Sequence, residues 1–323
     1  MQMNLRYDYS PSAPQASQIA LLDTFKGLSI LNSKNVEYSS RDGHVMGALV
    51  DITYTTNDAG ATTATVYGVP NTWKLHNAFR KFHIFRQEMF KEQGVTKSEI
   101  GRYSHTIRPN LFDSSISTDD LDIQISDPKP VDLPVLAKID SNDATGGDWD
   151  RTTFVSASQY TLAADAAIAD TWTVHLLGKH QESAGGPVDA SPRYVSVGMI
   201  HAYNQDRQQV QVQLEGTAIK ALDNPLAALI TQDVTSGELS EIVSEQETQL
   251  PPYDLVRDGD SVKPVALGEF RSTSYFDTGL PSSVTLKNVF LPAGFAAIDM
   301  GKGGLTGTFD VCVKALVECR EWA

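Results

Sequence analysis

The sequence contains few cysteines and no long apolar segment. Only 2 of its 323 residues are cysteines, Cys312 and Cys319. They stand an odd number of positions apart in one predicted strand, so their side chains are expected on opposite faces as free thiols. Free thiols are typical of folding in a reducing cytoplasm. No run approaches the roughly 18 apolar residues of a transmembrane helix, and residues 1–6 lack the apolar segment of a secretory signal.

The common catalytic motifs are also missing. The chain has no Gly-x-Ser-x-Gly, no His-Glu-x-x-His, no Cys-x-x-Cys and no phosphate-binding loop, and residues 301–304 are predicted to form a turn. His76 and His83 lie two turns apart on a predicted helix, but a zinc site needs at least three protein ligands. A cupin-type enzyme would need several histidines and carboxylates pointing into one barrel, and no such group is visible. We therefore predict a protein that is not an enzyme and has no resident cofactor.

Positive charge is scarce relative to negative charge. The chain has 26 Lys and Arg against 40 Asp and Glu, a formal net charge of -14. An acidic surface repels phosphate, so specific nucleic-acid binding is not expected. Apolar residues make up 41% of the chain, which is enough for a packed core.

The pattern that is present is the alternation typical of β-strands. In the last segment, every second position from Phe309 to Cys319 is apolar, including Ala315 and Val317, so these side chains are expected on the core face. Residues 57–60 have turn chemistry and predict a hairpin between the strands on either side. Similar patterns predict strands at 44–56, 61–69, 135–139, 151–156, 171–177, 194–203, 208–214, 262–275, 284–291 and 308–322.

Helical periodicity is clearest in residues 71–93. Leu75, Phe79, Phe82, Phe85 and Met89 recur at intervals of three and four, which is one face of an amphipathic helix. Asn71 or Thr72 is suited to cap its start, and Gly94 its end.

This predicted helix is rich in cations for an acidic protein. The basic patch either faces anionic lipid or packaged nucleic acid, or is solvated while the Phe face packs inward. Its basic residues are Lys74, Arg80, Lys81, Arg86 and Lys91.

The densest acidic turn supplies hard oxygen ligands of the kind that calcium prefers. Its spacing departs from the EF-hand pattern, because Ala144 occupies a ligand position, and a solvated turn before a strand is the alternative. The candidate calcium ligands are Asp140, Asn142, Asp143, Asp148 and Asp150.

The N-terminal segment and one internal segment divide the chain. Residues 1–15 are predicted to form an extended arm, followed by a short helix that ends at Gly27. Residues 178–192 have linker composition, and a short helix is predicted near 226–229. The predicted domains are an N-terminal arm with a short helix (1–30), a first barrel that includes helix 71–93 (31–185) and a second barrel (186–323).

Several segments resemble viral coat proteins. Residues 71–83, Asn-Thr-Trp-Lys-Leu-His-Asn-Ala-Phe-Arg-Lys-Phe-His, resemble a segment of capsid proteins of small DNA phages. Residues 250–254, 270–276 and 284–299 resemble the approach to the final strand of such proteins. The closest resemblance is to major capsid proteins of the double jelly-roll lineage from small lipid-containing icosahedral phages, which are corticovirus-like or finnlakevirus-like.

This resemblance implies an all-β chain with two jelly-roll β-barrels, which are antiparallel β-sandwiches, and a few helices in the connections. It also implies homotrimers shaped as pseudo-hexagonal capsomers, which tile an icosahedral shell over an internal membrane. The implied partners are neighbouring capsomers, penton and minor capsid proteins, and the lipid inside. The implied location is the virion, after synthesis in the host cytoplasm.

Two alternatives stay open. One is a single jelly-roll capsid protein of a small DNA virus, with elaborate loops. The other is a β-sandwich module that binds a receptor or glycan, such as a phage spike. An Arg-rich N-terminal arm for gripping a genome is not visible, and no heptad or fibre repeat suggests a stalk.

Overall fold

The structure is a computed structural model that describes both end regions of the chain and several segments between them. The described residues are 1–9, 19–56, 62–96, 99, 107–112, 131–133, 151–156, 170–182, 194–208, 264–272, 282–300 and 307–320.

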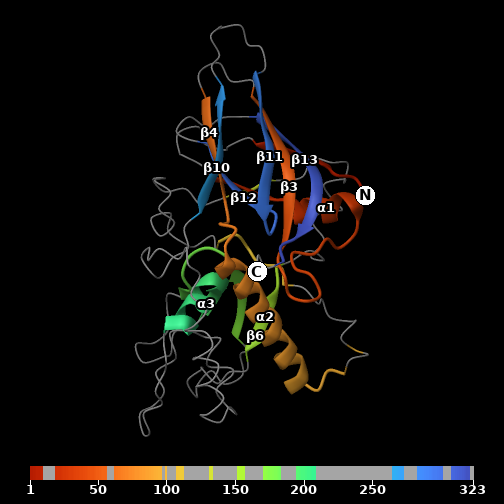
Figure 1. Cartoon of the computed structure of the whole chain (residues 1–323), viewed down its shortest axis with the longest axis vertical. Helices are drawn as coiled ribbons and strands as arrows, with labels where there is room; N and C mark the ends of the chain where they lie inside the picture. The colour runs from red at the N-terminus through yellow and green to blue at the C-terminus, as the bar shows by residue number, and fades with distance from the viewer. Residues whose placement is uncertain are drawn as a thin grey trace.

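Two β-sheets form the larger part of the described structure (Figure 1). All of their strand pairs are antiparallel except the short parallel pair of β2 with β5. Sheet A contains, in spatial order, β1 (Asn4–Tyr9), β13 (Gly307–Glu318), β3 (Met46–Thr56) and β11 (Ser282–Pro292). Sheet B contains β10 (Val265–Ser272), β4 (Thr62–Gly68), β12 (Phe295–Asp299), β2 (Ile19–Asp23) and β5 (Val131–Asp132).

The order of pairing is that of one wrapped ribbon. Apart from β5, the first strand pairs with the last (β1 with β13) and the second with the second-last (β2 with β12). The third and fourth strands pair with β11 and β10 in the same nested order. The pairs β13–β3 and β12–β4 then join the ribbon into two sheets. This nested antiparallel order is the topology of a jelly roll.

The two sheets pack face to face through aromatic side chains. Tyr54 of β3 lies against Phe270 of β10 with ring centroids 5.9 Å apart, and Phe309 of β13 stacks on Tyr54 at 4.8 Å. All three side chains are at most 2% exposed. In β3 the buried residues alternate, including Val50, Ile52 and Tyr54, because successive side chains of a strand point to opposite faces.

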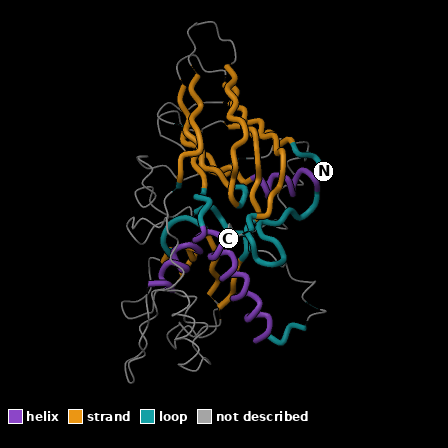
Figure 2. Tube along the Cα trace, in the orientation of Figure 1, coloured by secondary structure: helices purple, strands orange, loops and turns teal. Residues whose placement is uncertain are grey.

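Apart from β5, the described elements between β4 and β10 form a second, smaller assembly below the sandwich (Figure 2). A four-stranded sheet contains β6 (Thr153–Ser156), β7 (Asp170–His175), β9 (Tyr194–Gly198) and β8 (Gln181–Glu182) in that order. Helices α2 (Trp73–Glu92) and α3 (Met199–Gln208) pack together, with the Trp73 and Tyr203 rings 5.8 Å apart. Phe82 and Phe85 of α2 lie against Phe154 of β6.

Helix α2 confirms the sequence prediction. Thr72 caps its start, since its hydroxyl accepts a hydrogen bond from the Leu75 N–H. The predicted apolar face is buried from Leu75 to Phe85 and partly buried at Met89. Gly94 follows the helix with a φ of 70°, a left-handed conformation that favours glycine. Within the described part of the chain, no helix is both long enough and apolar enough to cross a membrane.

The predictions for the N-terminal segment are wrong. Residues 4–9 are strand β1, with Leu5, Tyr7 and Tyr9 buried, not an arm. Residues 19–23 are strand β2, and the helix that follows, α1 (Thr24–Asn32), continues through Gly27. Gly27 is needed for another reason: a Cβ at this position would collide with the Tyr7 hydroxyl.

The predicted hairpin of 44–56 with 61–69 is also wrong. Strand β3 belongs to sheet A, where it pairs with β11 and β13, and β4 belongs to sheet B, where it pairs with β10 and β12. Turn residues and alternation predict two strands and a reversal of direction. They do not tell whether the second strand returns to the same sheet or crosses to the opposite one.

Other predicted strands are found with small changes. The predictions at 151–156, 171–177, 262–275, 284–291 and 308–322 correspond to β6, β7, β10, β11 and β13. The segment 194–203 is divided between β9 and the start of α3. Segments 135–139, 209–214, 226–229 and 301–304 lie outside the described residues, as does most of the predicted linker 178–192.

The structure confirms an all-β chain of mainly antiparallel sheets with a few helices, but the described strands do not confirm two jelly-roll barrels. The strand pairing also does not follow the predicted domain boundary at residue 185. Strands from before and after residue 185 pair with each other in sheets A and B. A long insertion between paired strands is tolerated, since the entropy of loop closure grows only slowly with loop length.

The two cysteine thiols differ in solvent exposure, so they should react with a thiol reagent at different rates. Both are free; Cys312 is exposed and Cys319 is buried, and burial raises the pKa of the Cys319 thiol to about 11. We expect a disulfide-exchange reagent to modify one thiol quickly in the native protein and the second only after denaturation. The Cys312→Ser variant should show no fast thiol, and a fast reaction in that variant would contradict the placement of Cys319.

Candidate functional site

The five cations of α2 do not share one surface. Positions 80, 81 and 86 project in different directions, because each residue turns about 100° around the helix axis. Arg80 lies 3.3 Å from Nδ1 of His44, and the Arg86 guanidinium lies 5.4 Å from the centre of the Phe90 ring. Burial and the charge of Arg108 lower the pKa of Arg86.

The lysines of the helix also differ in their surroundings. Lys91 is exposed and pairs with Glu88 at 3.3 Å, whereas Lys74 is partly buried. Lys81 is also partly buried, and desolvation lowers the pKa of its ammonium group from 10.5 to about 7. The charge of Lys81 is therefore incomplete near neutral pH, and the five cations of the helix lie in different surroundings.

The predicted metal ligands are not gathered in the described structure. The calcium candidates Asp140, Asn142, Asp143, Asp148 and Asp150 lie outside the described residues. His76 is buried and hydrogen-bonded to Asn71, and His83 is bonded to Gln87 on the exposed side. Where the structure is described, no group of three or more His, Cys, Asp or Glu is arranged to hold a metal ion.

A buried serine–histidine pair was not predicted from the sequence. The ring Nε2 of His175 is 2.8 Å from the Lys179 carbonyl oxygen, which only accepts, so this nitrogen donates. Nδ1 therefore accepts from the Ser196 hydroxyl at 2.5 Å. Such a pair can activate a nucleophile, but both side chains are 0% exposed and fully used in joining β7, β9 and the Lys179 turn.

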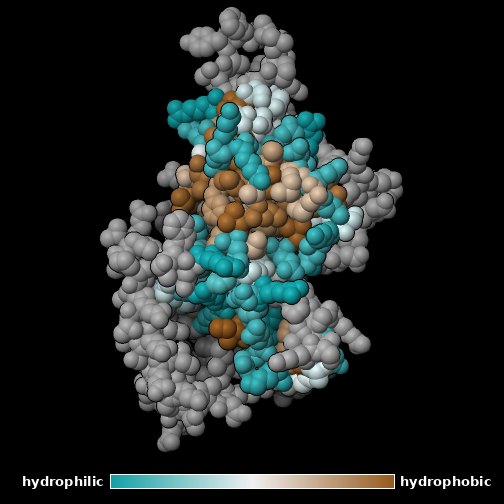
Figure 3. Space-filling view, turned by 45° about the vertical axis from the view of Figure 1, so that its right-hand side comes forward, coloured by the Kyte–Doolittle hydropathy of each residue, from teal (hydrophilic) through white to brown (hydrophobic). Residues whose placement is uncertain are grey.

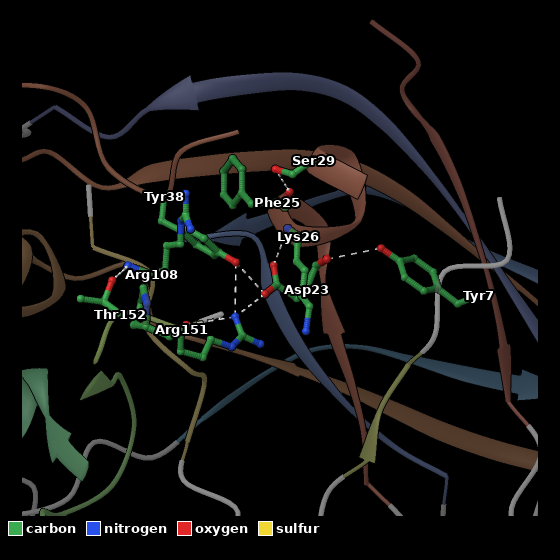
Figure 4. Close-up of polar contacts among 10 residues, drawn as sticks. Tyr7, Asp23, Phe25, Lys26, Ser29, Tyr38, Arg108, Arg151 and Thr152 are labelled. Carbon is green, nitrogen blue, oxygen red and sulfur yellow. Dashed lines mark hydrogen bonds and ion pairs between the residues drawn. The ribbon is translucent and has the colours of Figure 1, made fainter. Parts of the chain in front are cut away.

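A partly buried ion pair joins the sandwich to the inserted segment (Figure 4). Arg151, just before β6, donates to Asp23 at the end of β2 over 2.6 Å. The two side chains are 17% and 10% exposed. Arg151 also donates to the Pro109 carbonyl oxygen and lies over the Phe295 ring. One guanidinium thus contacts Asp23, Pro109 and Phe295, which are far apart in the sequence.

Asp23 holds several groups at this junction. Its carboxylate accepts from the Lys26 N–H, which caps α1, and from the Tyr38 hydroxyl at 2.8 Å. Burial and the neighbouring carboxylate raise the pKa of Tyr38, so the phenol stays protonated and donates. The backbone carbonyl of Asp23 also accepts from Tyr7 at 3.4 Å. These contacts tie β2, α1 and the residue before β6 together at the junction.

The outer face of sheet A has a distinct organisation. Its upper half is polar: the Thr53 and Thr285 hydroxyls are 2.9 Å apart on neighbouring strands. Arg6 of β1 forms a bidentate pair with Asp310 of β13 at 2.6 and 3.1 Å. Cross-strand pairs of this kind suit a solvated sheet face.

A polar cluster marks the middle of this face. Lys314 lies 2.8 Å from the carboxylate of Asp51 and donates to the Asn288 side chain at 2.7 Å. The Asn288 N–H donates to Asp51 at 2.7 Å. The bonds from Lys314 and Asn288 lower the pKa of Asp51. Asn288 has a φ of 58°, which asparagine tolerates better than most residues.

Two β-bulges lie beside this cluster. The register of β11 against β3 shifts between Leu286 and Val289, and that of β13 shifts between Val313 and Ala315. Each bulge adds one residue to its strand, so the side chains beyond it change faces. The prediction that Ala315 and Val317 face the core is therefore wrong, because both pair with outward positions of β3.

The residues beyond the bulges form an apolar area on the outer face. Phe290 and Ala315 both flank Leu49, and Val317 is opposite Gly47. The Phe290 ring lies over Gly47, where any Cβ would collide with it. Val317 is 43% exposed. We call these four residues, Leu49, Phe290, Ala315 and Val317, the outer apolar patch.

A space-filling view of the molecule shows where apolar side chains gather on one side of the sandwich (Figure 3). Figure 3 shows apolar side chains across the middle of the sandwich, between polar areas above and below. The sequence contains a signal for the outer apolar patch. Lys287 and Asn288 are consecutive polar residues inside an apolar strand, and this pair shifts the phase of the alternation.

Comparisons with known proteins add no relative. The chain matches no protein-family profile, no curated protein and no solved structure.

The ion pair at the junction should matter more than the exposed one. We expect Arg151→Met to lower the free energy of unfolding by about 3 kcal/mol, because Asp23 would keep a partly buried charge without its partner. Arg6→Met removes a pair whose side chains are 63% and 40% exposed and should change stability much less. Urea unfolding measures both variants, and equal losses would contradict the proposed importance of the junction.

Lys81 should make stability depend on pH. With a pKa of about 7 in the folded state and 10.5 when unfolded, the unfolded chain binds more protons between these values. Stability should therefore rise as pH increases from about 7 to about 10.5. The gain from Lys81→Met should be largest below about pH 7 and decrease toward high pH.

Thermal unfolding at about pH 6 and about pH 9.5 tests this dependence. Lys91→Met, at an exposed position of the same helix, is the matched control and should show no such trend. A gain from Lys81→Met that is the same at both pH values would disprove the effect of burial.

Proposed function

We propose that the chain is a structural coat protein of a virus, a capsid protein built on a single jelly roll. The observation that supports it most is the nested pairing of β1 to β4 with β13 to β10. Jelly rolls recur in viral capsids, in lectins and in cupins. The fold alone does not choose among these classes, so the choice rests on the interior and the surfaces of the barrel.

The interior of the barrel argues against the cupin class. A cupin binds its metal with histidines and carboxylates that point into the barrel. Here the inward positions of the described strands carry packed apolar and aromatic side chains, including Tyr54, Phe270 and Phe309. The centroids of these three rings lie 4.8 to 6.3 Å apart. The packed rings fill the space that a ligand would need. Such a barrel is suited to serve as a rigid block.

The strand order favours the single-barrel alternative over the tandem arrangement that the sequence resemblance implies. In a tandem pair, each barrel would close on strands from its own half of the chain. Here the two ends of the chain close one barrel, and the sheet of the inserted segment contains a parallel pair, β7 with β9. Trimers with a pseudo-hexagonal outline remain an expectation from the resemblance, as do penton proteins, minor capsid proteins and an internal membrane as partners.

The charge pattern is compatible with a shell protein that does not bind nucleic acid through β1 or α2. The net charge is -14, and residues 4–9 form a strand of the barrel. The cations of α2 are dispersed over different surroundings. The proposed location is accordingly the virion, with other copies of the same chain as principal partners.

Self-assembly tests this proposal. We expect the purified, nuclease-treated full chain to form defined oligomers or shells, because coat subunits associate through repeated contacts between identical copies. Light scattering after size-exclusion chromatography gives the mass, and negative-stain electron microscopy gives the outline. Hexagonal trimers would favour the tandem barrel, whereas shells that form only when nucleic acid is added would favour a genome-binding single barrel.

A chain that stays monomeric at every concentration tested would overturn the proposal. In that case, glycan-array binding would identify a receptor-binding module instead. Heating the sample through the unfolding transition before analysis is the control that separates assembly of the folded chain from aggregation.

A further inference from the structure

We propose that the outer apolar patch is the surface on which this chain contacts a second copy of itself. This inference rests on the proposed coat function and names the surface through which the shell would be held together. Its origin is the pair of bulges, which turn Phe290, Ala315 and Val317 from the core to the outer face.

The contrast within one sheet face supports a contact role. Above the bulges, the outward positions of the same strands carry Thr53, Thr285 and Asp310. Below them, the outward positions carry Leu49, Phe290 and Val317. A solvated face has no need for two bulges that expose apolar residues, since an unbroken alternation would have kept them in the core. The bulges cost backbone pairing, which burial of the patch in an assembly would offset.

The surroundings of the patch have the layout of a protein–protein contact. Stable contacts combine an apolar centre with a polar, hydrogen-bonded rim. The cluster of Asp51, Lys314 and Asn288 forms that rim on one side of the patch. Its three groups are held by hydrogen bonds to each other, so little side-chain freedom would be lost on association.

Charge indicates that the occupant is a second copy. The described strand residues of this face include three cations and three anions, in a chain whose net charge is -14. Two identical faces can therefore approach without the net repulsion that the rest of the acidic surface would impose. An anionic lipid surface or nucleic acid would find no excess of cations here. The charged residues are Arg6, Lys287, Lys314, Asp8, Asp51 and Asp310.

The outer apolar patch is small, so a contact between two isolated copies should have low affinity. A stable two-body contact buries roughly 800 Å² on each partner, far more than four side chains supply. An isolated pair should therefore be weak and dependent on concentration. In a shell, each copy has several neighbours, and the effective local concentration makes weak contacts sufficient.

A pair of valine substitutions tests the surface. Val317→Lys places a charge within the patch, at a position that is 43% exposed and tolerant of a long side chain. Val265→Lys is the matched control on β10 of sheet B, where valine is 46% exposed. We expect Val317→Lys to weaken self-association at least tenfold by analytical ultracentrifugation, and Val265→Lys to change it less than twofold.

The outcomes separate this inference from the proposed function. A wild-type chain that never associates overturns both. A wild-type chain that assembles, with Val317→Lys assembling equally well, overturns the patch alone. Equal weakening of self-association by the two lysine variants would also overturn the patch, because the effect would then come from the added charge and not from its position.

A second measurement does not depend on the variant folding. Hydroxyl-radical labelling of the Phe290 side chain in the wild type should fall at least twofold when dilute chain is concentrated into assemblies. Unchanged labelling of Phe290 in assembled wild type would overturn the proposal. Circular dichroism of Val317→Lys before ultracentrifugation confirms that a loss of association is not a loss of fold.

Discussion

The pairing of the first strand with the last is the constraint on which the rest of the structure depends. β1 lies along β13 over six residue pairs, from Asn4 with Cys312 to Tyr9 with Gly307. This contact brings both ends of the chain into sheet A, and the three inner pairs of the ribbon follow in nested order. The inserted segment between β4 and β10 then leaves and returns at neighbouring strands. Its junction with the sandwich is held by Asp23 and Arg151.

The same sheet also has two different outer surfaces. Two bulges at the level of Asp51 divide it into a polar half, with cross-strand hydroxyl and ion pairs, and an apolar half around Leu49. A bulge changes only one residue of pairing, but it reverses the faces of every side chain beyond it. The surface of a coat subunit can therefore be altered by local backbone irregularity while the core packing of Tyr54, Phe270 and Phe309 is kept.

The sequence predicted helix α2 but not the arrangement of the residues around it. It identified the helix of Lys81 and Arg86 and its buried Phe face, because periodicity reports which side chains point the same way. It did not show that the cations have different environments, with Lys81 desolvated and Lys91 paired in solvent. The outer apolar patch was missed because alternation was extended through Lys314, although two adjacent polar residues, Lys287 and Asn288, mark the phase shift in β11.

The sequence alone determined the class of the chain: alternating strands, one amphipathic helix with Asn71 or Thr72 as its cap, two cysteines that do not pair and an excess of acidic residues. These properties depend on neighbours within a few positions, so they are legible in the order of residues. Only the tertiary structure decided that β3 and β4 lie in opposite sheets, that residues 4–9 close a barrel, and that Val317 faces outward. Strand pairing joins residues hundreds of positions apart, and a strand's pattern specifies which face is apolar without specifying the partner beside it.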